Sequence, residues 1–106
     1  MIQVVSEADW KLFRGRISEW QERFMDKLIK DYSDLLTDPS KLSSDKFWIL
    51  EERINLDKKF KGVKCEMSRS TIFNNLINLY IEGAITDEDL EGFDEELIKS
   101  VKAAGF

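Results

Sequence analysis

The sequence predicts an all-α protein, a small helical bundle with a long N-terminal helix, two further helices and a short C-terminal helical segment. Apolar residues recur every three or four positions over residues 6–36, 45–60 and 64–82, which is the period of an amphipathic helix. Proline and glycine punctuate these stretches, as is typical of helix ends. No repeat, low-complexity tract or linker divides the chain. We therefore expect one helical domain over residues 1–106.

The first helix is expected to begin at Ser6 and to continue to Leu36. About thirty helical residues span roughly 45 Å, whereas a compact domain of this length has a radius of gyration of about 13 Å. Such a helix must protrude, bend or pack against another chain. A bend would be expected at Gly15, the weak point of the helix. If it projects, Trp10, Phe13 and Ile17 form an exposed apolar patch, and such patches mark interfaces. We therefore predict a homodimer through this helix.

A second helix is expected over Asp45–Phe60, capped by Ser43 or Ser44, and a third, central helix over Lys64–Glu82. Thr86 and the acidic residues after it are typical of a helix N-terminus. The C-terminal segment is then a short helix, a break near Gly92 and a final helix to about Ala104. The predicted core contains Trp20, Phe24, Phe47, Leu50, Ile54, Phe73, Leu76 and Tyr80.

Composition limits the classes of partner and the compartment. The 106 residues are 42% hydrophobic, carry a net charge of −5 and have a pI of about 4.8, so the whole molecule does not attract phosphate backbones or anionic lipid. The longest uncharged run, Ser70–Ile81, has twelve residues, fewer than the roughly twenty that span a membrane. Cys65 is the single cysteine, and the first residues lack the basic region of a signal peptide. We expect a cytoplasmic protein.

The residue types exclude several kinds of chemistry. The chain has no histidine and one cysteine, whereas a structural zinc site needs four nitrogen or sulfur ligands and a Ser or Cys nucleophile normally needs a histidine base. Residues 87–92 imitate the start of a calcium loop, but Ile98 stands where the loop needs its bidentate glutamate. We therefore predict no catalytic, cofactor-binding or metal-binding residues, and we interpret the acidic residues as helix caps.

One alternative is DNA binding. Residues 67–86 resemble the recognition helix of winged-helix regulators, Lys58, Lys59, Lys61 and Lys64 precede them, and their asparagines match adenine edges in hydrogen-bonding pattern. An acidic segment follows at Thr86, where winged-helix proteins have a hairpin and phosphate contacts. A helix-turn-helix regulator therefore remains the second hypothesis.

Three blocks, at residues 19–25, 46–54 and 83–93, resemble a group of small uncharacterised bacterial proteins, mostly from Firmicutes, some of which carry the label "multidrug transporter". The resemblance implies a small helical bacterial protein and supplies no catalytic residue. The leading prediction is a non-catalytic protein-interaction or assembly module that dimerises or binds another protein, without nucleic acid or membrane.

Overall fold

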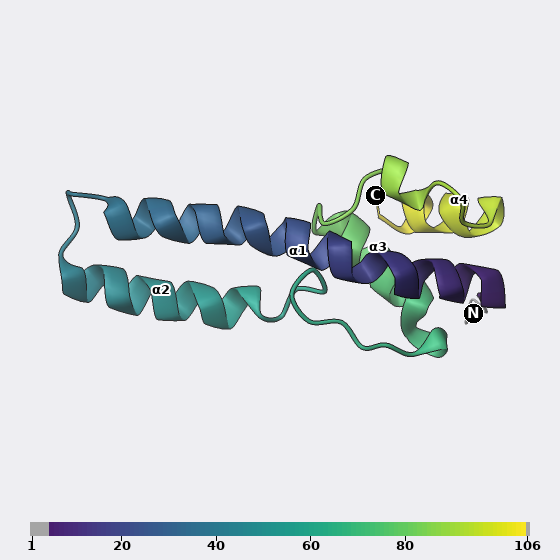
Figure 1. The fold of residues 1–106 in the computed structure, drawn as a ribbon, viewed down its shortest axis with the longest axis horizontal. Coiled ribbons are helices and arrows are strands. Elements are labelled where there is room, and N and C mark those ends of the chain that lie inside the picture. Colours follow the sequence, from purple (N-terminus) through teal and green to yellow (C-terminus); the bar gives the residue numbers. More distant parts are fainter. Residues whose placement is uncertain (1–4, 106) are drawn as a thin grey trace.

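The computed structural model describes residues 5–105, which form helices and loops and contain no strand (Figure 1). The elements are α1 (Glu7–Thr37), α2 (Ser43–Asp57), α3 (Ile72–Ile81) and α4 (Glu95–Ala104), with short 3₁₀ helices η1 (Arg69–Thr71) and η2 (Glu88–Leu90). The predicted all-α fold, with its long first helix and short C-terminal helical segment, is confirmed.

The long helix α1 organises the molecule. The Ser6 hydroxyl accepts a hydrogen bond from the Asp9 amide at 3.1 Å, as expected of a helix cap, and the helix then runs without interruption through Gly15. Its first half lies against α3 and α4, and its second half lies beside α2 (Figure 1). The molecule measures 51 × 25 × 23 Å, with a radius of gyration of 16.5 Å, clearly more extended than a compact domain of this length, for which about 13 Å is expected.

Two parts share α1, a head and a hairpin. The head contains the first half of α1 with α3, η2 and α4, and the hairpin contains residues 24–64, which comprise the second half of α1, the turn and α2. Most of the hydrophobic core lies in the head, where Phe13, Leu76 and Val101 have no exposed surface. The prediction that Phe47 and Ile54 belong to the core is wrong, because both lie on the hairpin and are 62% and 38% exposed.

The third helix is shorter than predicted, because the segment before it is held by side chains. Arg69 donates two hydrogen bonds to the Val5 carbonyl at 3.0 and 2.8 Å. The Asn75 amide donates to the Glu66 carbonyl at 2.8 Å. These bonds hold residues 64–68 as a non-helical segment along the head, so α3 begins only at Ile72.

The C-terminal segment contains a break and a cap. Gly92 has a φ of +96°, a backbone conformation that glycine adopts without steric cost, and the chain turns there as predicted. Asp94 then caps α4 by accepting hydrogen bonds from the Glu96 and Leu97 amides. The Asp94 amide in turn donates to the buried carboxylate of Asp9 at 3.1 Å, which ties the start of α4 to the start of α1.

The unequal burial of two phenylalanines predicts unequal effects of one substitution. Phe13→Ala should lower the free energy of unfolding by about 3–5 kcal/mol, because it leaves a cavity in the head. Phe47→Ala should change it by less than about 1 kcal/mol, because this ring is largely exposed. Urea denaturation at low protein concentration measures both values, and equal losses for the two variants would contradict the division into head and hairpin.

Candidate functional site

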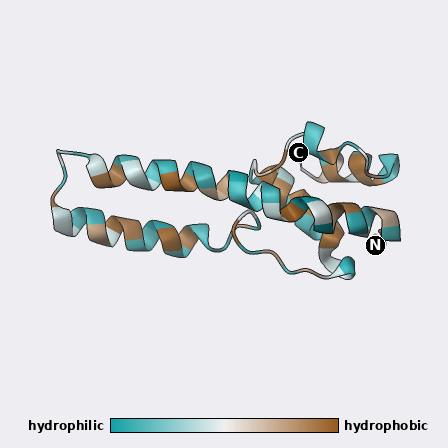
Figure 2. Ribbon diagram, in the orientation of Figure 1, coloured by the Kyte–Doolittle hydropathy of each residue, from teal (hydrophilic) through white to brown (hydrophobic). Residues whose placement is uncertain are grey.

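Exposed apolar side chains concentrate on the hairpin. Eight of the ten large hydrophobic residues that are notably exposed among those described lie between residues 29 and 60, and Figure 2 shows apolar bands along both helices there. No residue of α2 is buried. Single exposed apolar residues are ordinary, but a group on one projecting element is a candidate contact surface.

Four of these residues share one face of the hairpin. Ile29 and Leu36 are seven residues apart on α1, and Phe47 and Ile54 are seven apart on α2, so each pair lies on one side of its helix. The hydroxyl of Tyr32, which lies between Ile29 and Leu36 on α1, is hydrogen-bonded to Asp57, one turn after Ile54 on α2. This bond places both pairs on the same side, and we call Ile29, Leu36, Phe47 and Ile54 the apolar face.

Polar contacts between the two helices explain why this face points outward. Arg53 lies 3.8 Å from the Asp31 carboxylate, and its guanidinium is 5.4 Å from the centre of the Tyr32 ring. Burial and the hydrogen bond to Asp57 raise the pKa of Tyr32 to about 12. Because Arg53 and Asp57 occupy the side of α2 that faces α1, Phe47 and Ile54 are turned to one flank of the hairpin, where they stay exposed.

The base of the hairpin is anchored to the head. The amides of Lys61 and Gly62 donate to the Glu82 carboxylate at 3.0 and 3.1 Å, and Gln21 donates to the Lys61 carbonyl at 3.1 Å. Gly62 packs so closely on Phe24 that an added Cβ would lie 2.4 Å from its ring. The direction in which the hairpin leaves the head is therefore defined by packing, and position 62 admits no side chain without a shift of Phe24.

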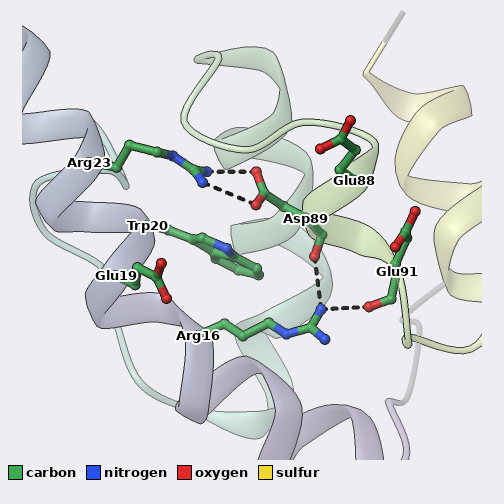
Figure 3. A pocket seen from close by; sticks show the side chains of 7 residues that line it. All are labelled: Arg16, Glu19, Trp20, Arg23, Glu88, Asp89 and Glu91. Atoms are coloured by element: carbon green, nitrogen blue, oxygen red, sulfur yellow. Dashed lines mark hydrogen bonds and ion pairs between the residues drawn. The ribbon is translucent and has the colours of Figure 1, made fainter.

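Two arginines of α1 hold the loop that contains η2, as Figure 3 shows. Arg23 pairs with the Asp89 carboxylate at 2.6 Å and donates to the Ala84 carbonyl at 2.9 Å. Arg16 donates to the backbone carbonyls of Asp89 and Glu91 at 3.0 and 2.6 Å. Both guanidinium groups are thus engaged within the chain. Their bonds, which surround Trp20, join α1 to the loop that contains η2 and so stabilise the head.

The acidic residues of this loop do not converge. Asp87 accepts a hydrogen bond from the Tyr80 hydroxyl at 2.7 Å and lies 3.7 Å from Lys102, whereas Asp89 binds Arg23 and the amide of Thr86. Within residues 5–105 no group of three or more His, Cys, Asp or Glu side chains is placed to hold a metal ion. The expected cap at Thr86 is reversed, because the carboxylate of Asp89 caps the Thr86 amide.

The predicted interface residues Trp10, Phe13 and Ile17 lie in the head. Phe13 is fully buried and Ile17 is 5% exposed, while Trp10 is half-buried with the Arg14 guanidinium 5.0 Å from its ring centre. The expectation that they form an exposed apolar patch is wrong, because α1 projects at its C-terminal end. The sequence analysis missed Ile29 and Leu36. Both lie beside the main apolar stripe of the helix rather than on it, and this position could have indicated that they are exposed.

Two of the residues that the DNA-binding hypothesis would use to read bases are hydrogen-bonded within the chain. Arg69 and Asn75 are occupied by the backbone bonds that shape the segment before α3, and Ile72, Leu76 and Leu79 of that helix are buried. Lys58, Lys59, Lys61 and Lys64 line a surface hollow with Cys65 at the base of the hairpin. Burial raises the pKa of the Cys65 thiol, which keeps it protonated at neutral pH.

No family model, curated protein or solved structure matches the chain. None of the helices formed by residues 5–105 has the length and apolar character to cross a membrane.

The Arg23–Asp89 pair predicts a pH-dependent stability. Burial would raise the pKa of Asp89, but its bonds to Arg23 and Thr86 outweigh that effect and lower it. The pair therefore contributes above the ordinary aspartate pKa of about 3.9 and is lost as the pH falls through the lower value in the folded state. Asp89→Asn should cost about 1 kcal/mol at pH 7 in urea denaturation.

This difference should begin to shrink as the pH falls below about 4, where the carboxylate of the unfolded chain takes up a proton, and should vanish below the lower pKa of the folded state. The matched variant Glu88→Gln changes an exposed neighbour in the same loop and should leave the profile unaltered. A constant difference between Asp89→Asn and the wild type from pH 7 to pH 2 would contradict the assignment.

Proposed function

We propose that the protein is a non-catalytic interaction or assembly module that forms a homodimer through the apolar face of its hairpin. The observation that carries the proposal is the position of this face, which lies on a projecting element in an otherwise well-buried chain. Fully covering a side chain such as Phe or Ile contributes about 1.5–3 kcal/mol. Because the four side chains are 38–62% exposed, covering each of them adds about half of that free energy, which together favours association.

A second copy is a suitable occupant because the hairpin does not repel itself. The whole chain has a net charge of −5, but residues 24–64 contain nine basic and eight acidic residues. Two faces built from helices of about fifteen residues would bury on the order of 1,000 Å² in total, near the lower limit for specific association. We therefore expect a dimer that forms at micromolar concentration.

The helix-turn-helix alternative receives less support. A base-reading helix needs free polar side chains on its exposed face, whereas Arg69 and Asn75 are engaged in bonds within the chain. The acidic loop around Asp89 belongs to the same head as α3, and its negative charge would oppose the approach of a phosphate backbone.

Matched substitutions on α2 test the proposal. Phe47→Asp places a charge on the apolar face and should convert the dimer to a monomer in light scattering at micromolar concentration, because the charge would be buried without a partner. Leu56→Asp makes the same kind of change on another side of the same helix, where Leu56 is 55% exposed, and should leave the dimer intact.

In both variants the head should unfold at the same temperature as in the wild-type protein. A monomeric wild-type protein over the whole micromolar range, or equal effects of the two variants, would overturn the proposed function.

A further inference from the structure

The hairpin carries opposite net charges at its two ends. Its distal half, residues 31–52, contains six acidic and two basic residues, for a net charge of −4. Its base half, residues 24–30 and 53–64, contains two acidic and seven basic residues, for a net charge of +5. The sum is nearly neutral, but the two ends attract opposite partners.

The charge boundary coincides with the centre of the apolar face. The Asp31–Arg53 and Phe24–Phe60 contacts establish which residues of the two helices lie at the same level. In this register, the sign changes after residue 30 on α1 and after residue 52 on α2, at one level of the hairpin. The midpoint of Ile29 and Leu36 and the midpoint of Phe47 and Ile54 each lie two residues, or about 3 Å, from that level.

We infer that the partner is a second copy that packs antiparallel on the apolar face, with the acidic distal half of each hairpin against the basic base half of the other. This inference rests on the proposed assembly function and specifies its geometry. A twofold axis across the hairpin at the charge boundary generates the arrangement. An interface of this symmetry must be self-complementary, and the coincident centres of charge and apolar surface meet that requirement.

The same axis pairs the apolar residues. It brings Ile29 of one copy toward Leu36 of the other, and Phe47 of one copy toward Ile54 of the other. A parallel arrangement would instead oppose two halves of charge −4 and two of charge +5. Like charges brought together oppose association, so the parallel arrangement is disfavoured.

Charge reversal at the base tests the orientation. Lys58 and Lys59 are exposed, and Lys58→Glu with Lys59→Glu reduces the charge of the base half from +5 to +1. We expect the dimer dissociation constant, measured by sedimentation, to rise at least about tenfold at low salt. The control Lys11→Glu with Lys99→Glu changes the net charge equally at exposed sites of the head and should have a much smaller effect.

Cross-linking gives an independent readout, with Cys65→Ser in every variant. Glu51→Cys lies near the proposed axis, so a short bis-maleimide should link two copies. Lys41→Cys lies in the turn at the far end of the hairpin and should not react with its own counterpart. Its position would allow linkage in a parallel dimer.

The outcomes separate the orientation from the proposed function. A dimer that tightens on charge reversal, or that is linked through Lys41→Cys, overturns the antiparallel arrangement and leaves the assembly function standing. A dimer insensitive to charge reversal also overturns it. A wild-type protein that stays monomeric at all concentrations overturns the proposed function itself.

Discussion

The structure depends on one constraint, which is the length of α1. A helix of 31 residues extends about 46 Å, and the head covers only its first half. The apolar side of the second half must be covered by another element, and α2 covers part of this side. Because α2, with 15 residues, is about as long as this free half, the chain builds an antiparallel pair of helices rather than a thicker bundle, and much of the pair stays in contact with solvent.

The contacts between α1 and α2 decide what that solvent-facing surface presents. If apolar residues alone formed the contact between α1 and α2, Phe47 and Ile54 would be buried in it and the outer surface would be polar. Here Arg53 and Asp57 occupy the inner side of α2 and meet Asp31 and Tyr32. Polar groups between helices need specific partners, because an unpaired one would be costly to bury. They therefore specify the rotation of α2, and this rotation presents the apolar stripe to the outside.

Much of the fold followed from local signals. The cap at Ser6, the end of α1 next to Leu36 and the turn at Gly92 were all predictable, because each depends on one residue and its neighbours. The start of α3 was not, because it depends on bonds from Arg69 and Asn75 to distant or non-adjacent backbone. Periodicity alone gave residues 64–71 as helix, and these tertiary hydrogen bonds override it.

The sequence predicted exposed apolar residues on α1, but at the wrong end of the helix. The sequence indicated that α1 outruns its domain and exposes apolar residues, but it did not show which end projects. The answer depends on whether the final segment packs on the first or second half of α1. Long-range contacts such as Arg23 to Asp89 and Asp94 to Asp9 decide this, and they join residues too far apart in the chain for a local pattern to reveal.

Amide hydrogen exchange as a function of protein concentration tests the central claim most directly, that the hairpin is an interface between copies. Exchange in α3 should be slow at every concentration, because this helix lies in the core of the head. Exchange in α2 should be slow when the protein is concentrated and should accelerate by at least about tenfold on dilution, as the covering copy dissociates. Equal protection of α2 at all concentrations would contradict the account.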